Sequence, residues 1–130
     1  MTLNDHLANV LASIVNYERV GKKELEVKIA SKMVKNVLSI MKDHRYIGEY
    51  SISKDNKGES LKINLLGNVN KCGVIKPRFS VKKDNYEKFE KRFLPARGFG
   101  FLIVSTPQGL MIHEDAKMKN IGGRLIAYIY

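Results

Sequence analysis

Apolar and polar residues alternate in patterns that predict five helices and strands over residues 1–66. A helix comes first, because apolar residues recur at helical spacing at Leu7, Val10, Leu11, Ile14 and Val15. Strict alternation over 24–29 then predicts a strand with one buried face. A second helix is indicated by an apolar stripe at Val34, Val37, Leu38 and Met41. Two strands, 46–53 and 60–66, flank a turn-rich segment and predict a hairpin.

Residues that start and stop helices lie at the expected places. Asn4 or Thr2 can cap the first helix, Gly21 can end it, and Ser31 can cap the second. The order helix, strand, helix, strand, strand predicts a layered unit in which the helices cover one face of a short sheet.

The periodicity is lost between Gly67 and Pro77, so we expect two subdomains, 1–66 and 67–130. In the second, the pattern predicts a strand at 79–81, a short helix capped by Asp84 and ended by Pro95, and a buried strand at 98–104. A turn at 106–109, a strand at 110–112, a helix at 114–120 and a final alternating strand at 125–130 follow. The prediction is an α+β fold, with an N-terminal α-β-α-β-β unit packed against a mainly antiparallel, β-rich subdomain.

Composition narrows the class of protein. With 130 residues, of which 44% are hydrophobic and 28% charged, the chain is long enough for a real core and is unlike a disordered protein. No apolar run approaches the roughly 18 residues of a membrane span, and the N-terminus lacks the features of a signal peptide. We therefore expect a cytoplasmic protein with no membrane partner. Cys72 is the only cysteine, which excludes an intrachain disulfide.

Charge favours a polyanionic partner. The net charge is +10, and residues 66–130 carry 12 basic and 5 acidic groups against 11 and 8 in residues 1–65. The segment 71–97 is the most basic, and Phe79, Tyr86, Phe89 and Phe93 interleave with its cations. Such a mixture suits phosphate contact with stacking on a base or sugar, although a solvated basic surface with core aromatics would give the same pattern.

Groups for covalent chemistry are sparse. Ser105 precedes a Thr-Pro turn rather than sitting in a nucleophile elbow, and no base and acid can be assigned to it beyond a weak combination with His113 and Asp115. The histidines have no metal-ligand spacing, and Gly98-x-Gly100 precedes a strand rather than a phosphate-binding helix. We expect no enzyme, no catalytic residue, no metal and no cofactor; a small serine hydrolase using Ser105 is the rival hypothesis.

The polar residues of the C-terminal half suit a folded RNA. Ser105 and Thr106 offer short donors and acceptors for 2′-hydroxyls and phosphates, and Gln108 can reach a base edge. Gly109, Gly122 and Gly123 would let a nucleic acid backbone approach. Ordinary turn chemistry around Pro107 explains the Ser-Thr pair about equally well.

The same residues carry a family resemblance. Gly98-Phe-Gly100, Val104-Ser105-Thr106, Gly109-Leu-Met111, Ala116, Gly122-Gly123, Leu125 and Tyr128 resemble the C-terminal signature of the small-subunit ribosomal protein eight family. Asn4 to Asn9 and Ala30-Ser31-Lys32 are similar to its opening pattern. Lys71 to Arg78 and Phe93 to Arg97 look like the archaeal and eukaryotic branch. Pro107 departs from bacterial relatives, which often have a third hydroxyl there.

The resemblance implies a structural protein of the small ribosomal subunit. Such a protein binds an irregular stem in the central domain of small-subunit rRNA, assists assembly and touches neighbouring ribosomal proteins. The alternative is a general nucleic-acid-binding protein or a translational repressor. Charge alone would favour a nonspecific DNA-binding or chromatin-like protein. The candidate RNA-binding residues are Ser105, Thr106, Gln108, Gly109, Gly122, Gly123, Ser31, Lys32, Asn4, Lys82, Lys83, Arg92, Lys117 and Arg124.

Overall fold

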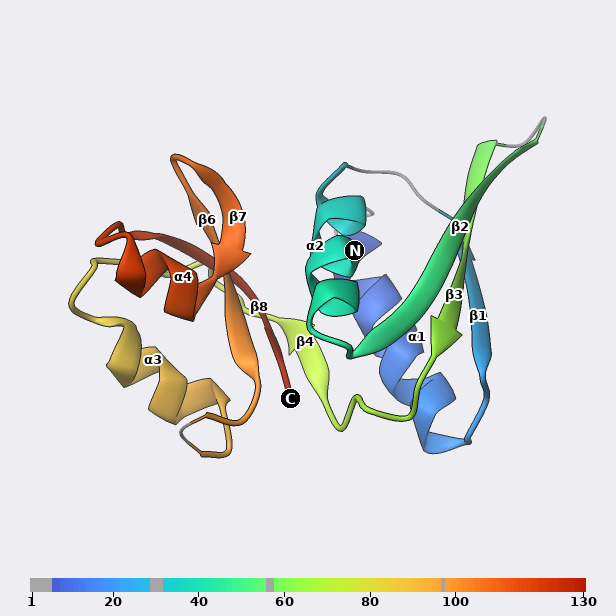
Figure 1. Ribbon diagram of the computed structural model, residues 1–130, viewed down its shortest axis with the longest axis horizontal. Coiled ribbons are helices and arrows are strands. Elements are labelled where there is room, and N and C mark those ends of the chain that lie inside the picture. Colours follow the sequence, from blue (N-terminus) through green and yellow to red (C-terminus); the bar gives the residue numbers. More distant parts are fainter. Residues whose placement is uncertain (1–5, 29–31, 56–57, 97) are drawn as a thin grey trace. The chain divides into compact units, whose positions relative to one another are not determined.

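The computed structural model of the chain describes residues 6–28, 32–55, 58–96 and 98–130 (Figure 1). Its helices and strands form two compact units, residues 1–70 and 71–130, called here the N-terminal unit and the C-terminal unit. The sequence places the boundary slightly earlier, after Leu66. Helices and antiparallel sheets together confirm the predicted α+β fold. None of the described helices is long and apolar enough to span a membrane.

The N-terminal unit has the predicted order of elements. They are α1 (His6–Arg19), β1 (Glu24–Lys28), α2 (Lys32–Asp43), β2 (Ile47–Asp55) and β3 (Gly58–Leu65). The strands form one antiparallel sheet in the order β1-β3-β2. Gly21, with φ of 75°, lies just after α1, and the N–H of Lys22 donates to the Tyr17 carbonyl at 3.0 Å. The caps predicted at Asn4, Thr2 and Ser31 lie outside the described residues.

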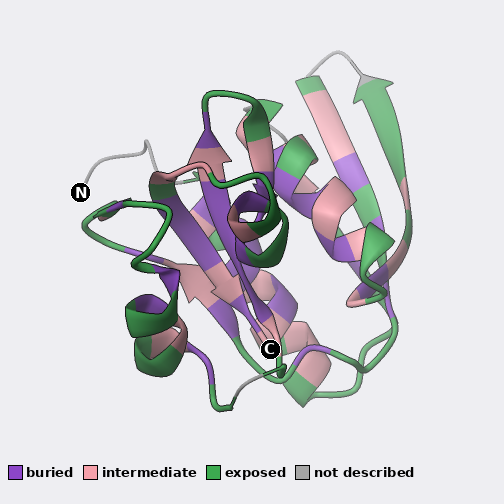
Figure 2. Cartoon of the chain, turned by 60° about the vertical axis from the view of Figure 1, so that its left-hand side comes forward, coloured by how far each residue is buried: buried purple, intermediate pink, exposed green. Residues whose placement is uncertain are grey.

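The core of the N-terminal unit follows the sequence pattern closely. The buried face of α2 consists of the four predicted residues, and α1 buries Leu7, Val10, Leu11 and Ile14. Alternate residues of β3, Leu61, Ile63 and Leu65, are buried as well (Figure 2). Each fully buried leucine or isoleucine contributes roughly 1.5–3 kcal/mol. The apolar faces of the two helices and of β3 therefore together form the core of the N-terminal unit.

The C-terminal unit is a five-stranded antiparallel sheet with two short helices. Its elements are β4 (Cys72–Val74), β5 (Ser80–Val81), α3 (Tyr86–Phe93), β6 (Phe101–Thr106), β7 (Gly109–Ile112), α4 (His113–Met118) and β8 (Gly123–Ile129). The strand order is β4-β8-β6-β7, and β5 also pairs with β8. The final strand of the chain is therefore central to the sheet, with three strands paired to it.

A single apolar cluster holds α3, α4 and one face of this sheet together. Tyr86 and Phe89 come from α3, Ala116 from α4, and Leu102 and Leu125 from the sheet. The Tyr86 hydroxyl donates to the Ile121 carbonyl at 2.9 Å, and burial raises the pKa of this tyrosine. A buried phenol with its donor satisfied adds apolar area without the penalty of an unpaired polar group.

Three details of the C-terminal prediction were wrong. Residues 72–74 were expected to be irregular but form β4, whose partners lie more than fifty residues away in β8. The buried strand begins at Phe101, not Gly98, and continues to Thr106. The cap of α3 is Asn85, which makes no side-chain hydrogen bond; Asp84 does not cap, because the chain turns once more before the helix and Asn85 N–H bonds to the Lys82 carbonyl at 2.9 Å.

The strict alternation expected in the last strand is also broken. Ile126 is buried together with Leu125 and Ala127. The register with β6 shifts at this point, since Ile103 faces Ala127 while Val104 faces Leu125. Ile126 is thus the extra residue of a bulge, which re-aims the side chains that precede it.

Candidate RNA-binding site

The pairing of strands gathers most of the predicted RNA-binding residues at one end of the C-terminal sheet. Arg124 faces Ser105 on one side and Ser80 on the other. Residues directly opposite each other in antiparallel strands share a face of the sheet, with Cβ atoms about 4.5–5.5 Å apart. Two hydroxyls and one guanidinium therefore emerge in a row, called here the Ser-Arg-Ser row.

The β6–β7 turn continues this row. Thr106 and Gly109 form the last pair of the hairpin, with Pro107 and Gln108 between them. The Thr106 hydroxyl donates to the Gly109 carbonyl at 2.8 Å and accepts from the Gln108 N–H at 3.1 Å. Thr106 is 8% exposed, whereas Gln108 is exposed and Ser105 is half-buried. The hydroxyl of Thr106 thus holds the turn, and the side chains of Ser105 and Gln108 are the more accessible ones.

The glycine pair lies beside the row and is required by packing within the chain itself. A Cβ atom at Gly123 would lie 2.3 Å from the Ser105 carbonyl oxygen, and one at Gly122 would lie 2.4 Å from the Val81 carbonyl oxygen. Neither position tolerates a side chain, because the backbones of neighbouring strands approach too closely. Gly109 differs: its φ is 113° and open space surrounds it. Contact of these glycines with RNA stays a prediction.

Cations flank the same end of the sheet. Lys82 and Lys83 follow β5 directly and are exposed, as is Arg124. Within the described part of the chain, none of the three forms an ion pair with a carboxylate. Unneutralised cations beside short hydroxyls create a positive field at this edge.

Three other candidates are not brought to the Ser-Arg-Ser row. Arg92 lies on α3, with its guanidinium carbon 5.0 Å from the Phe79 ring centroid and 5.4 Å from that of Phe93. Lys117 lies on α4 and pairs with Glu90. Lys32 is the exposed first residue of α2 in the N-terminal unit. Ser31 and Asn4 lie outside the described residues.

One residue of the row was missed by sequence reasoning. Ser80 is exposed and sits opposite Arg124, yet it lies 25 positions before Ser105. The only local signal was its polar position beside Val81 and the Lys82-Lys83 pair. Pairing of β5 with β8, which joins segments distant in sequence, is what makes it part of the site.

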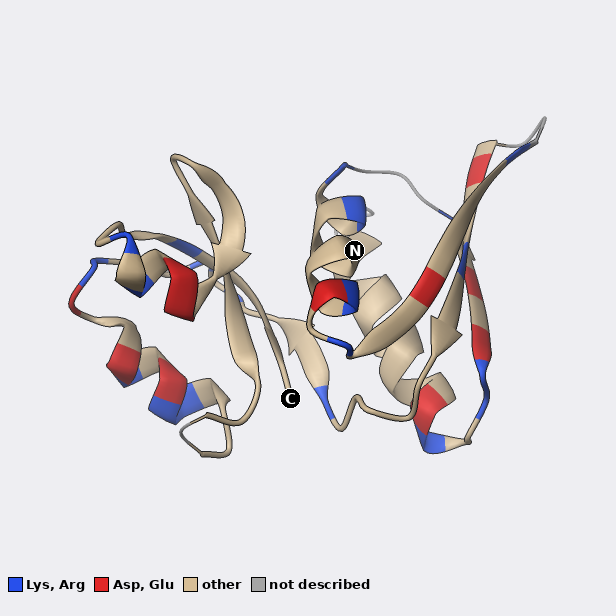
Figure 3. Ribbon diagram, in the orientation of Figure 1, with Lys and Arg blue, Asp and Glu red and all other residues tan. Residues whose placement is uncertain are grey.

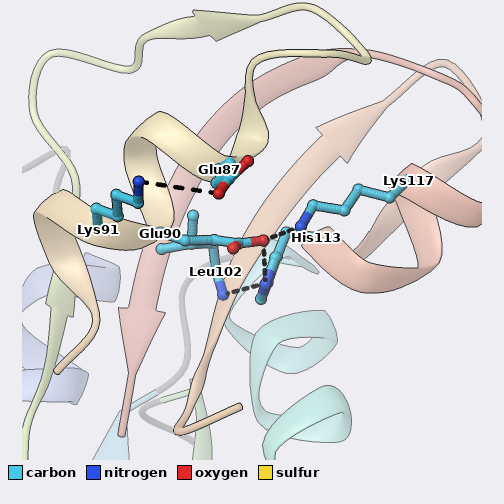
Figure 4. Close-up of polar contacts among 6 residues, drawn as sticks. All are labelled: Glu87, Glu90, Lys91, Leu102, His113 and Lys117. Atoms are coloured by element: carbon cyan, nitrogen blue, oxygen red, sulfur yellow. Dashed lines mark hydrogen bonds and ion pairs between the residues drawn. The ribbon is translucent and has the colours of Figure 1, made fainter. Parts of the chain in front are cut away.

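The geometry of His113 bears on the rival hydrolase hypothesis. Its Nδ1 accepts a hydrogen bond from the Leu102 N–H at 3.0 Å, and its Nε2 lies 3.1 Å from Glu90 Oε1 (Figure 4). The proton therefore sits on Nε2 and is donated to Glu90. Burial is the main cause that lowers the pKa of this histidine, and Lys117 adds to the effect. Both ring nitrogens are engaged inside the unit, so neither serves as a base for Ser105.

Metal-binding chemistry finds no support in the described residues, which contain no cluster of three or more His, Cys, Asp or Glu side chains able to hold an ion. Cys72, the only cysteine of the sequence, is buried in β4 and forms no intrachain disulfide. A buried free cysteine behaves as a small apolar residue.

A basic chain with cations, hydroxyls and a turn gathered at one sheet end is typical of a nucleic-acid-binding protein. Comparison with protein families makes the assignment specific: the model of the Ribosomal protein S8 family matches residues 5–130. The chain belongs to this family. It is a ribosomal protein of the small subunit that binds rRNA and ribosomal proteins, and its family is structural rather than enzymatic.

Proposed function

We propose that this chain is a primary rRNA-binding protein that recognises an irregular stem in the central domain of small-subunit rRNA and assists assembly there. The observation that carries the proposal is the Ser-Arg-Ser row, in which Ser80, Arg124 and Ser105 share one face beside Lys82 and Lys83. The C-terminal unit would thus be the main rRNA-binding unit.

The composition of the row matches what a double-stranded RNA displays. The wide minor groove of A-form RNA exposes 2′-hydroxyls, which both donate and accept hydrogen bonds and suit serine side chains. Arg124, Lys82 and Lys83 would contact phosphates, which fix orientation but carry no sequence information. An irregular stem adds unpaired base edges, for which Gln108 is the accessible amide. Ser105 and Gln108 would therefore read the RNA, and the cations would position it.

The hydrogen bonds of Thr106 give it a different role from that of Ser105. The residue is 8% exposed, and its hydroxyl already makes two hydrogen bonds within the turn. We assign it to positioning Gln108 and Ser105. Lys32, exposed at the start of α2, would add a phosphate contact from the N-terminal unit.

The test is binding of the full chain to a central-domain stem and to a scrambled duplex of equal length, across a salt series. We expect a preference of several hundredfold or more for the stem that persists at about 0.15 M salt. Equal affinities that fall together with salt, with duplex DNA competing equally, would leave only the +10 charge acting and would refute specific recognition.

Two variants distinguish a residue proposed to recognise the RNA stem from a residue proposed only to position it. Ser105→Ala should weaken binding to the stem by about 1–3 kcal/mol while scarcely changing binding to the scrambled duplex. Lys82→Ala should weaken both and reduce the salt slope by about 1. Ser53→Ala and Lys23→Ala, exposed residues of the N-terminal unit, are the matched controls. Equal losses on both RNAs for Ser105→Ala would contradict the division.

A further inference from the structure

The C-terminal unit contains a second surface whose charge is opposite to that of the Ser-Arg-Ser row. A cavity of about 490 Å³ opens between α3, the segment after it and the start of α4. Leu94, Pro95 and Ala96 give it an apolar wall, and carboxylates come from Glu87, Glu90 and Glu114. No residue of the Ser-Arg-Ser row lines it.

Charge separation within the unit is pronounced. Residues 71–130 contain 12 basic and 5 acidic residues. Three of the five carboxylates line this cavity, and Asp115 is adjacent to Glu114 in the first turn of α4 (Figure 3). Four of the five acidic residues of this strongly basic unit are therefore on α3 and α4, and the fifth, Asp84, follows Lys83 in sequence.

The cations of the cavity are largely neutralised from within. Lys117 pairs with Glu90, and Lys91 Nζ lies 3.8 Å from Glu87 Oε1 (Figure 4). His113 donates its one proton to Glu90. Glu114 is exposed and, among the described residues, has no ion-pair partner. Among the described residues, the cavity thus keeps one carboxylate, that of Glu114, without a cationic partner.

Two exposed apolar side chains are adjacent in sequence to residues that line the cavity. Phe99, 64% exposed, lies between two glycines that line the cavity, and Met118, 83% exposed, follows Lys117 on α4. Aromatic and methionine side chains are enriched in the centres of protein interfaces. An RNA phosphate would be repelled by Glu114 and Glu87, whereas a cationic protein segment would be attracted.

We propose that the cavity between α3 and α4 is a docking site for a cationic, partly apolar segment of a neighbouring protein in the small subunit. An Arg or Lys side chain of that segment enters between Glu114 and Glu87, with its aliphatic stem against Leu94 and Pro95. Its apolar neighbours cover Phe99 and Met118. The site is separate from the RNA surface, so both partners bind at once.

The first experiment is carboxylate labelling with a carbodiimide and glycine ethyl ester, read by mass spectrometry. Three samples are compared: the free chain, the chain bound to its rRNA stem alone, and the assembled small subunit. We expect Glu87 and Glu114 to be labelled in the first two and protected in the third. Protection by the stem alone would assign the surface to RNA, and full labelling in the assembled subunit would show that nothing docks there; either result overturns the proposal.

The second experiment identifies the contact. Carbodiimide without added amine activates the Glu114 carboxylate, and the amine of a lysine within reach displaces the activating group to form an amide. We expect a crosslink from Glu114 to a lysine of another ribosomal protein, lost in Glu114→Gln but kept in Glu26→Gln, which changes an exposed carboxylate of β1. Crosslinks from Glu114 only to lysines of the same chain would refute docking.

Arg97 requires its own control, because it lies between Ala96 and Gly98 in sequence but outside the described residues. If the guanidinium of Arg97 were the occupant, Glu87 and Glu114 would resist labelling in the free chain and become reactive in Arg97→Ala. That outcome would show that the cavity is occupied by Arg97 of the same chain and would overturn the proposal of a partner protein. Unchanged labelling in Arg97→Ala, with protection only in the subunit, supports the partner.

Discussion

The two units of this protein carry almost the same number of cations but arrange their carboxylates differently. In the N-terminal unit, lysines pair with carboxylates on other elements, as in Lys62–Glu24 at 3.3 Å and Lys35–Glu59 at 2.8 Å. The hydrogen bond from Lys35 is the main cause that lowers the pKa of Glu59. In the C-terminal unit, four of the five acidic residues lie on α3 and α4, and among the described residues Lys82, Lys83 and Arg124 form no ion pair. The location of carboxylates, more than the count of cations, therefore decides which surface attracts a polyanion.

The units also differ in how tightly their backbones approach. The glycines of the N-terminal unit that have positive φ, such as Gly67, stand in open space and serve to turn the chain. Gly122 and Gly123 in the C-terminal unit are overlapped by carbonyl oxygens of adjacent strands. The sheet end proposed to face RNA thus contains two adjacent positions where any side chain is excluded.

The largest effect is expected from filling one of these positions. Gly123→Ala places a methyl group against the Ser105 carbonyl and the Val104 side chain, and should destabilise the chain by about 3 kcal/mol. Gly67→Ala, with open space but φ of 78°, should cost only about 1 kcal/mol. Urea unfolding of the two variants measures the difference. Equal losses would mean that the close approach at Gly123 does not constrain the sheet.

A smaller loss of stability is expected from removing the Thr106 hydroxyl in the β6–β7 turn. Thr106→Val keeps the shape of the side chain but removes the bonds to Gly109 and Gln108, and should cost about 1 kcal/mol of stability. Thr106→Ser should restore most of it. Ser53→Ala, at an exposed position of β2, should change stability little. If Thr106→Val unfolds at the same urea concentration as the unmodified chain, the hydroxyl does not hold the turn.

The smallest effect on stability at neutral pH is expected from the protonation of His113. Its pKa in the folded chain lies below its ordinary value, chiefly through burial, with Lys117 of α4 acting in the same direction and Glu90 of α3 and Glu114 of α4 opposing. Between the folded and unfolded pKa values the unfolded chain binds more protons. Stability is therefore complete above about pH 6.5 and falls as the pH drops toward the folded pKa, by at most about 1.4 kcal/mol per pH unit.

Unfolding midpoints from pH 7 to 5 test this linkage. The midpoint of the unmodified chain should fall more steeply with acidification than that of His113→Gln. His44, exposed just after α2 in the N-terminal unit, provides the matched control substitution His44→Gln. A slope that persists in His113→Gln would assign the pH dependence to other groups.

Local pattern was sufficient for much of the N-terminal unit because most of its elements are long enough for their periodicity to show, even though β1 pairs with β3, which lies far along the chain. The apolar stripes of α1 and α2 were predicted residue by residue. The C-terminal unit was harder. β4 and β5 span three and two residues, and both pair with β8. A strand was predicted at 79–81 but not at 72–74, and no window of neighbouring residues reveals that either segment pairs with β8.

The candidate site shows the same division. Ser105, Arg124, Lys82 and the glycine pair were selected from the sequence, yet their assembly depends on β8 lying between β5 and β6. The pairing of β5 with β8 also adds Ser80 to the site. The amine of Lys117 pairs with Glu90 and is not part of the site. Residue types can be read from the chain, but which of them converge is set by strand order.

By itself, the sequence determined the class of fold, the helices of the N-terminal unit, the excess of positive charge and the resemblance to a ribosomal family. These depend on composition and on periodicities of two and 3.6 residues, which are local properties of a polypeptide. Only the tertiary structure decided that the Thr106 hydroxyl bonds within its own turn, that carbonyl oxygens of adjacent strands exclude side chains at Gly122 and Gly123, and that three carboxylates of the C-terminal unit line one cavity. The last two depend on contacts between segments distant in sequence. The first is local, but it depends on side-chain geometry that the residue type leaves open, because turn chemistry and RNA contact suit the same Ser-Thr pair.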